Sequence, residues 1–335
     1  MNIWRTLRRA ETASSRRGES PVIHVAPSSS LTGFLLAVGS AALFALSGIF
    51  ATSLMVAGWS AGAAVTVRVL LATAVLALPT ALALRGKWRT VLAAWQPVLL
   101  FGLIAITLCQ LAYYFAVQHI APSYALLIQY MGPVLLVLWL WLRLRVAPHP
   151  LTTVGALAAV TGLVVVSGIG TGGALHPLGV LFALTAAVGN AVFYVLSADA
   201  NHGIAPLPLV GLGLGVASVA LVIAAATGLL PFTVGTATPV IAGVELPVAV
   251  VLACLSLLST VLAYLLGVAA VRHLGATVAS FTGYSEPMFG IVWTILLLAI
   301  VPSGLQWVGA ALIMSGVVTV KLGEVYQARR GRAAA

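Results

Sequence analysis

The sequence predicts an all-α integral membrane protein of ten transmembrane helices, arranged as two inverted five-helix repeats. Three observations support this prediction: the composition, a succession of apolar runs, and an internal repeat. Hydrophobic residues make up 61% of the 335-residue chain and charged residues only 7%, whereas soluble domains carry about 25% charged residues. A chain of this composition cannot cover a water-facing surface, so we expect it to lie in a bilayer.

Apolar runs of about the ~20 residues that cross a bilayer follow one another from Leu31 onward. Short breaks containing turn residues, such as RGKWR and HGIAPLP, separate the runs. The expected spans are 31–55, 60–84, 95–118, 122–142, 151–169, 177–198, 207–230, 247–270, 274–299 and 304–321.

The two ends of the chain are expected to lie outside the repeats. Residues 1–30 are basic and polar, with no apolar stretch that could form a signal peptide, which predicts a disordered cytoplasmic tail. Residues 322–335 are expected to form a cytoplasmic C-terminal tail. The first five-helix repeat would then occupy residues 31–169 and the second residues 177–321.

The distribution of basic residues predicts the orientation in the membrane. Every Lys and Arg except Arg68 lies in or beside a segment that is cytoplasmic if the N-terminus is inside. The external breaks contain none, and one of them carries Glu245. By the positive-inside rule both termini are cytoplasmic, and the net charge of +10 reflects topology rather than a nucleic-acid partner. We expect a multi-pass membrane protein.

Two halves of the chain share one sequence pattern. VQHIAPSYALLIQYMGPVLLVLWLWL aligns without a gap with the later VRHLGATVASFTGYSEPMFGIVWTIL, so that Tyr130 falls on Tyr284 and Pro133 on Pro287. Roughly a third of the positions match along this register. Because each copy holds an odd number of spans, the second crosses the membrane upside down. Inverted repeats of this kind build the substrate sites of secondary transporters.

The paired prolines Pro133 and Pro287 are candidate hinges. A proline inside a membrane helix removes one backbone hydrogen bond and permits a kink. The alternative is that they have no special role, since prolines are frequent in membrane helices. Their equivalence in the repeat favours a hinge.

Two charged residues lie deep within expected spans: Arg68 in the second and Glu286 in the ninth. A charge at mid-bilayer costs about 2.5–3.5 kcal/mol on insertion scales, so such residues are functional candidates. Glu286 lies ~18 Å from either surface and is a candidate coupling group, with protons as the candidate coupling ion. An Arg68–Glu286 pair is feasible by depth. The alternatives are that the pair only orients helices, or that Arg68 extends outward.

Uncharged polar residues recur on single faces of the expected spans. Each alone would be explained by an interhelical hydrogen bond, but as a set on repeat-equivalent spans they favour a cavity. The candidate substrate-binding residues are Gln110, Tyr114, Gln129, Tyr130, Asn190, Tyr194, Tyr264, Tyr284 and Ser285.

The sequence contains no pattern for a cofactor, a metal or an enzyme. Cys109 and Cys254 lie inside apolar runs, and the histidines lack metal-ligand spacing. An HExxH motif does not occur. GLGLG lies inside a span, where close helix packing explains it better than nucleotide binding.

Several motifs resemble the drug/metabolite transporter superfamily, in its EamA-type branch of ten-span carriers. They are VAAVRHLGATVASFTGYSEPMFGIVW followed by PSGLQWVGAALIMSGVVTV in the second half, and IAPSYALLIQYMGPVLLVLWLWL followed by LTTVGALAAVTGLVVV in the first. VTVRVLLATAVLALP, which contains Arg68, is similar to the second-span arginine motif of that branch. The chain departs from the family at Arg145–Val146 and Ala299–Ile300, where a Gly-Glu pair is usual.

The resemblance implies export of small metabolites, amino acids or toxic compounds from a bacterial cytoplasm across the inner (plasma) membrane, coupled to an ion or proton gradient or running as facilitated diffusion. The inverted repeats favour alternating access as the mechanism. An importer or exchanger remains an alternative, because sequence does not fix direction. An intramembrane enzyme acting on lipid would need a nucleophile–base or metal constellation, and a multi-span sensor would need a signalling domain. Neither feature is visible in the sequence. We expect a small-molecule substrate and a lipid bilayer as partners.

Overall fold

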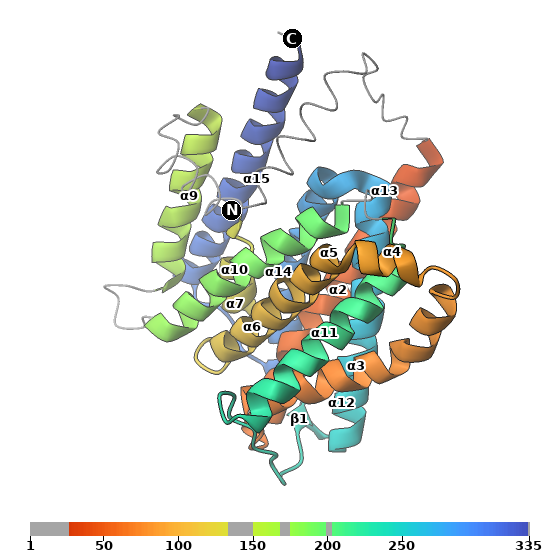
Figure 1. The fold of residues 1–335 in the computed structure, drawn as a ribbon. Helices are drawn as coiled ribbons and strands as arrows, with labels where there is room; N and C mark the ends of the chain where they lie inside the picture. The colour runs from red at the N-terminus through yellow and green to blue at the C-terminus, as the bar shows by residue number, and fades with distance from the viewer. Residues whose placement is uncertain (1–26, 133–149, 168–174, 199–202, 334–335) are drawn as a thin grey trace.

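The structure is a computed structural model that describes residues 27–132, 150–167, 175–198 and 203–333 (Figure 1). All but the last four residues of the expected N-terminal tail therefore lie outside the described residues. So do Pro133 and the rest of the expected fourth span, residues 133–142.

The described part of the chain is mostly helical. In chain order its elements are α2 (Pro27–Val56), α3 (Ala61–Ala83), α4 (Trp88–Ala93), α5 (Trp95–Leu100), η1 (Phe101–Leu108), α6 (Cys109–Val117), α7 (Pro122–Gln129), α9 (Pro150–Ser167), α10 (Pro177–Ala198), α11 (Pro206–Ala226), β1 (Val240–Ile241), β2 (Val244–Glu245), α12 (Val248–Ser256), η2 (Leu257–Leu262), α13 (Ala263–Gly283), α14 (Ser285–Leu298) and α15 (Gly304–Ala333).

Six of the described helices are long and apolar enough to cross a membrane, and three shorter ones are also apolar. The six are Leu31–Val56, Ala61–Ala83, Trp95–Val117, Pro177–Ser197, Pro206–Ala226 and Val248–Leu274, and the shorter ones are Pro150–Val165, Ser285–Leu298 and Gly304–Val320. The chain is a multi-pass, all-α membrane protein. The count of ten spans stays a prediction, because the described residues hold the expected fourth span only as far as α7.

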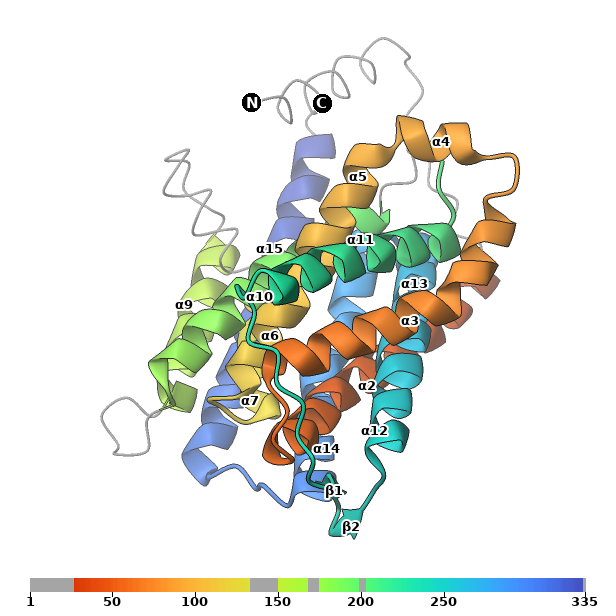
Figure 2. The same cartoon turned by 60° about the horizontal axis from the view of Figure 1, so that its bottom comes forward.

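α2 is the central helix of the bundle. It packs against α3, α6, α7, α12, η2, α13 and α14. The short antiparallel pair β1–β2 lies at one end of the bundle, between α11 and α12, with Ile241 opposite Val244 (Figure 2). Helices from both halves of the chain therefore meet at α2.

The break expected at residues 271–273 is helical in the structure, because α13 continues to Gly283. These residues include no proline, and nothing in them prevents helical backbone geometry. The chain nevertheless reverses relative to α2. Ser40 Oγ donates to the carbonyl of the first α13 residue, and Leu274 lies beside Gly33. Trp293 Nε1 then donates to Ala42 O, further along α2, so the reversal falls between residues 274 and 293.

Two segments of the bundle are π-helical, η1 in the third expected span and η2 in the eighth. In each, a threonine hydroxyl donates to the carbonyl five residues earlier. Thr107 Oγ1 lies 2.8 Å from Gly102 O, and Thr260 Oγ1 lies 2.9 Å from Leu255 O. The two segments occupy overlapping positions of the repeat register. Short π-helical segments are frequently found at functional sites.

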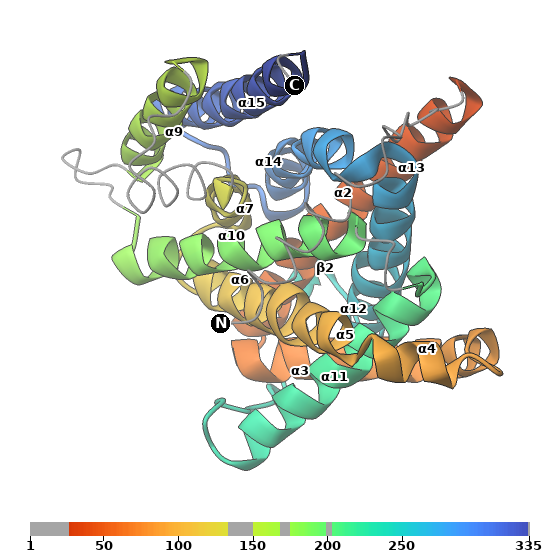
Figure 3. The ribbon, with the colours of Figure 1, turned by 45° about the horizontal axis from the view of Figure 1, so that its top comes forward.

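α9 and α15 lie side by side at one edge of the bundle (Figures 1 and 3). Glycines allow their backbones to touch: a Cβ on Gly155 would lie 2.7 Å from Gly316 O, and one on Gly162 would lie 2.7 Å from Gly309 O. Small residues permit such close approach in membrane helices. In the repeat register Gly155 corresponds to Gly309 and Gly162 to Gly316, so the two contacts exchange equivalent residues.

Candidate functional site

A cavity of about 60 Å³ lies between the two halves of the chain. The first half contributes α2, η1, α6 and the end of α7 to its wall, and the second half contributes α10, α13 and α14. Its polar and aromatic lining consists of Ser40, Phe44, Ser47, Cys109, Gln110, Tyr113, Gln129, Tyr130, Asn190, Phe193, Tyr194, Tyr264 and Glu286.

The structure brings most of the predicted site residues to this cavity. Six predicted binding residues and the predicted coupling carboxylate line it: Gln110, Gln129, Tyr130, Asn190, Tyr194, Tyr264 and Glu286. Four other predicted residues are not part of the lining: Arg68, Tyr114, Tyr284 and Ser285. Of these, Ser285 Oγ donates to Thr282 O at 2.7 Å, so its hydroxyl bonds the preceding turn of the helix.

Arg68 is fully buried within α3, directly behind the cavity wall. Its guanidinium carbon lies 5.4 Å from the centre of the Tyr114 ring. It donates to Ser47 Oγ at 2.5 Å, Tyr114 OH at 2.7 Å, Thr260 Oγ1 at 2.8 Å, Ser259 O at 2.8 Å and Gln110 Oε1 at 3.2 Å. These bonds satisfy the charge inside the protein, so Arg68 does not extend outward to the membrane surface.

Glu286 lies on the other side of the cavity, in the first turn of α14. Its side chain is 8% exposed, and its Oε2 accepts a hydrogen bond from Tyr130 OH at 2.8 Å. Across the described ranges no ion pair joins Arg68 to Glu286, so the pair that depth made feasible is not formed. The physical reason is that hydroxyl, amide and carbonyl oxygens of α2, α6 and η2 already surround the guanidinium.

Two hydrogen-bonded groups therefore face each other across the cavity. On the Arg68 side, Gln110 Nε2 donates to Tyr264 OH at 2.9 Å. On the Glu286 side, the hydroxyls of Tyr130 and Tyr194 lie 3.5 Å apart. Both groups present polar atoms to the cavity, but only the second presents an ionisable carboxyl group to it.

The helices that carry these residues break at repeat-equivalent tyrosines. α7 ends at Gln129 and is followed by Tyr130, while Tyr284 separates α13 from α14. The two rings pack edge to face with centroids 5.6 Å apart. Pro287 is buried in the first turn of α14, where a missing N–H costs no intrahelical bond. The helical hydrogen bonding is thus interrupted at Tyr284, three residues before Pro287.

Sequence reasoning missed several lining residues, chiefly Phe44, Phe193, Ser47 and Tyr113. The aromatic rings pack edge to face: Phe44 lies 4.8 Å from Tyr264, and Phe193 lies 5.8 Å from Tyr264, between ring centroids. One available signal was the seven-residue spacing of the α2 serines 40 and 47, which places both on one helix face. No comparable signal marked the phenylalanines.

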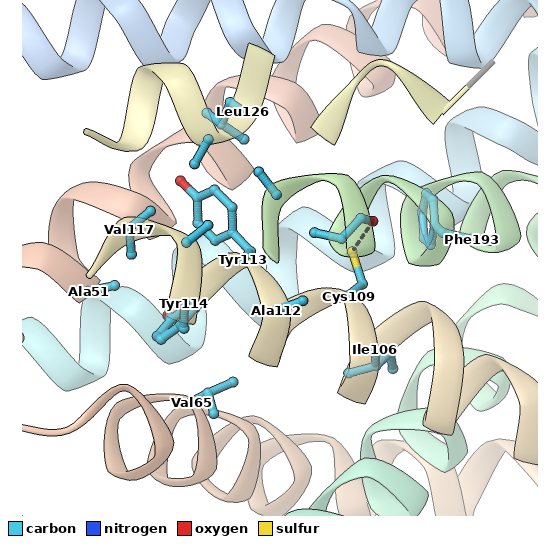
Figure 4. Close-up of a cluster of buried hydrophobic side chains, with 14 of the residues drawn as sticks. Ala51, Val65, Ile106, Cys109, Ala112, Tyr113, Tyr114, Val117, Leu126 and Phe193 are labelled. Carbon is cyan, nitrogen blue, oxygen red and sulfur yellow. Dashed lines mark hydrogen bonds between the residues drawn. The ribbon is translucent and has the colours of Figure 1, made fainter. Parts of the chain in front are cut away.

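Neighbouring side chains of α6 point to different sides of this helix (Figure 4). Tyr113 points toward Leu126 of α7 and lines the cavity, whereas Tyr114 points toward Val65 of α3. Cys109 Sγ lies 3.4 Å from the carbonyl oxygen of Ala186.

Two polar atoms at the cavity have no hydrogen-bond partner among the described residues. They are the Gln129 side-chain oxygen and the Tyr113 hydroxyl, both on buried residues. A buried polar atom without a partner is costly, but both atoms are closed to a water-sized molecule, and the Tyr113 hydroxyl lies against Gly48 of α2. In the same described part, no three His, Cys, Asp or Glu side chains gather as they would around a metal ion.

Comparison with known proteins identifies the family. The model of the EamA-like transporter family matches residues 31–168 and again residues 177–322. No curated protein matches the chain. Among the matching solved structures, one described only as the crystal structure of a protein is 20% identical and gives a TM-score of 0.53. That match covers 88% of this chain and 96% of the other, and it shows a shared fold alone. The chain belongs to the EamA-like transporter family.

Proposed function

We propose that this protein exports small polar or amphipathic metabolites, amino acids or related compounds, across the bacterial inner membrane by alternating access. The carrying observation is the cavity between the two halves, lined by buried polar side chains and one carboxyl group. Members of the family are transporters, and buried polar residues around a cavity are typical of a substrate pathway in a membrane protein.

Contacts between equivalent residues support two inverted repeats that meet at this cavity. Gln110 corresponds to Tyr264 in the repeat register, and the two are hydrogen-bonded at 2.9 Å. Tyr130 corresponds to Tyr284, and their rings touch. Equivalent residues can contact each other only near the axis that relates the repeats. The substrate site would then lie on that axis, within ten spans and with both termini in the cytoplasm.

Repeat-equivalent histidines contact glycines near two ends of the bundle, and these contacts are the proposed gates of alternating access. A Cβ on Gly33 would lie 2.9 Å from His273 Cβ, and one on Gly179 would lie 3.0 Å from His119 Cβ. His119 and His273 are repeat equivalents. Opening one contact while the other stays closed would expose the cavity to one side of the membrane at a time. The helix breaks at Tyr130 and Tyr284, with Pro133 and Pro287 nearby, would serve as the hinges.

Glu286 is the proposed coupling group. Across the described residues it is the one acidic side chain in the cavity lining, and a carboxylate inside a membrane protein is stabilised by a proton or by a bound cation. The Tyr130 hydroxyl at 2.8 Å holds the carboxyl group in place. Export driven by inward proton movement would use Glu286 to carry the proton.

Metabolite profiling of cells and medium during induced expression tests export. We expect one class of compound to accumulate in the medium with the wild-type protein. Glu286→Gln should abolish the accumulation or remove its dependence on pH, while Glu245→Gln, which changes an exposed carboxylate in β2, should match wild type. Accumulation of the compound inside the cells would show that the protein imports it. A profile unchanged by the wild-type protein would refute export.

Cysteine pairs test alternating access directly. The pairs Gly33→Cys with His273→Cys and Gly179→Cys with His119→Cys place Cβ atoms close enough for a disulfide after a small relaxation. Oxidation of either pair should stop transport, and reduction should restore it. Each single-cysteine variant, oxidised in the same way, is the control. Full transport with both pairs locked would rule out alternate opening at these ends.

A further inference from the structure

The charges around the cavity are unequal, and this inequality restricts the substrate. Arg68 is 0% exposed, does not line the cavity, and donates its hydrogen bonds to protein oxygens. Its charge is therefore not available to pair with a carboxylate of a bound solute. Glu286 does line the cavity, and its repeat equivalent is Gly132, which has no side chain to balance it. Among the lining residues the one full charge that a solute could meet is negative.

Aromatic rings line the same cavity as this carboxyl group. Tyr130, Tyr194, Phe193, Phe44 and Tyr264 all line the cavity. The last four form a chain of edge-to-face contacts, with centroids 5.2 Å apart for Phe193–Tyr194 and 4.8 Å for Phe44–Tyr264, and Tyr130 meets Tyr194 through its hydroxyl. Such packing fixes the rings before any ligand arrives. Aromatic faces attract cations, most strongly where water is excluded.

The acceptors of the lining match a solute that donates hydrogen bonds. The side-chain oxygen of Gln129 accepts from no described residue, and it is closed to solvent until the side chain turns. An amide oxygen can only accept, and an ionised Glu286 can likewise only accept. Both match an ammonium group with N–H donors. The carboxylate of an amino acid would find amide and hydroxyl donors there, such as the Asn190 amide, but no cationic partner.

We propose that the cavity binds a compact primary or secondary ammonium ion that carries no carboxylate. This assignment rests on the proposed transport function and narrows its substrate class to amines. Glu286 and the Gln129 oxygen would accept from the ammonium group, and the aromatic rings would surround its carbon skeleton. The cavity of about 60 Å³ is far below the ~300–1,000 Å³ of drug-sized sites, which favours a small solute.

Three matched solutes test the assignment: isobutylamine, its neutral analogue isobutyl alcohol, and valine, which is isobutylamine with a carboxylate added. Binding of each to the purified full-length protein in lipid nanodiscs is measured by titration calorimetry at pH 7. We expect isobutylamine to bind at least about tenfold more tightly than either analogue, because the alcohol lacks the ammonium charge and valine would bury a carboxylate that has no cationic partner.

Variants locate the binding to this cavity. Glu286→Gln should weaken isobutylamine binding by about tenfold or more, Gln129→Leu and Phe193→Leu by a few-fold each, and Glu245→Gln not at all. Gln129→Leu and Phe193→Leu keep the test decisive if Glu286→Gln does not fold. The assignment is overturned if valine or the alcohol binds as tightly, if isobutylamine does not bind, or if none of the cavity variants changes its affinity.

Failure of this inference can be told apart from failure of the transport proposal. Accumulation of another solute in the metabolite profile, with no binding of isobutylamine, would refute the ammonium assignment and leave export in place. Tight and Glu286-dependent amine binding with an unchanged profile would support the assignment and refute export.

Discussion

Arg68→Met should destabilise the protein by about 3 kcal/mol. Methionine keeps an unbranched chain in the same space but removes all the donors, so five hydrogen bonds are lost. Interhelical hydrogen bonds in membrane proteins average ~0.6 kcal/mol, which gives the figure of about 3 kcal/mol. The insertion cost of the charge acts in the same direction, since an unfolded state would expose Arg68 to lipid.

Arg68→Lys separates charge from geometry. Lysine keeps the positive charge but is a compact ammonium group with three donors, and it cannot reproduce the planar fork that reaches α2, α6 and η2 together. We expect a loss of roughly half that of methionine, about 1–2 kcal/mol. Arg85→Met removes an arginine that is exposed in a loop, and it should stay within about 0.5 kcal/mol of wild type.

The measurement is the free energy of unfolding of each variant in mixed micelles, followed by loss of tertiary structure on addition of denaturing detergent. A difference between Arg68→Met and wild type no larger than that of Arg85→Met would refute the reasoning. Equal losses for methionine and lysine would show that the geometry of the fork, rather than its charge, holds the helices together.

Two further substitutions test helix packing and the site. Gly155→Ala should destabilise the protein by about 1–3 kcal/mol, because its Cβ would meet backbone atoms of α15 at 2.6–2.7 Å. Gly215→Ala should not destabilise it, because a Cβ there would meet open space. Equal free energies of unfolding for the two variants would contradict the close packing of α9 and α15. Tyr130→Phe should reduce transport strongly, because Glu286 loses its hydrogen-bond donor at 2.8 Å. Tyr194→Phe should reduce transport less, since the Tyr194 hydroxyl lies 3.5 Å from that of Tyr130. Equal activities of the two variants in a vesicle uptake assay would contradict this role of the Tyr130–Glu286 hydrogen bond.

Helix periodicity and hydrophobicity predicted much of the fold, because a bilayer requires long apolar helices. The expected span 177–198 coincides with α10 (Pro177–Ala198), and 60–84 differs from α3 (Ala61–Ala83) by one residue at each end. The π-helical geometry of η1 and η2 was not predictable. It depends on threonine hydroxyls that select a carbonyl five residues back, and threonine is common in ordinary helices.

Polar residues of the cavity were predictable because each is unusual in a membrane span, and unusual residues carry information. Gln110, Tyr264 and Glu286 were found in this way and line the cavity. Phe44 and Phe193 were not found, since a phenylalanine is equally suited to lipid, to the protein core and to a binding site. Only tertiary contacts distinguish these three environments.

The direction in which Arg68 points could not be predicted from depth alone. Depth placed Arg68 near Glu286, and Coulomb attraction suggested a pair. The structure instead gives the guanidinium acceptors on α2, α6 and η2, and it leaves Glu286 with one tyrosine donor. A buried arginine is stabilised by several geometrically matched neutral acceptors as well as by one carboxylate, without the cost of burying a second charge. Glu286 is thereby left unneutralised by the protein, and this is the condition under which a proton or an ammonium ion can bind and leave.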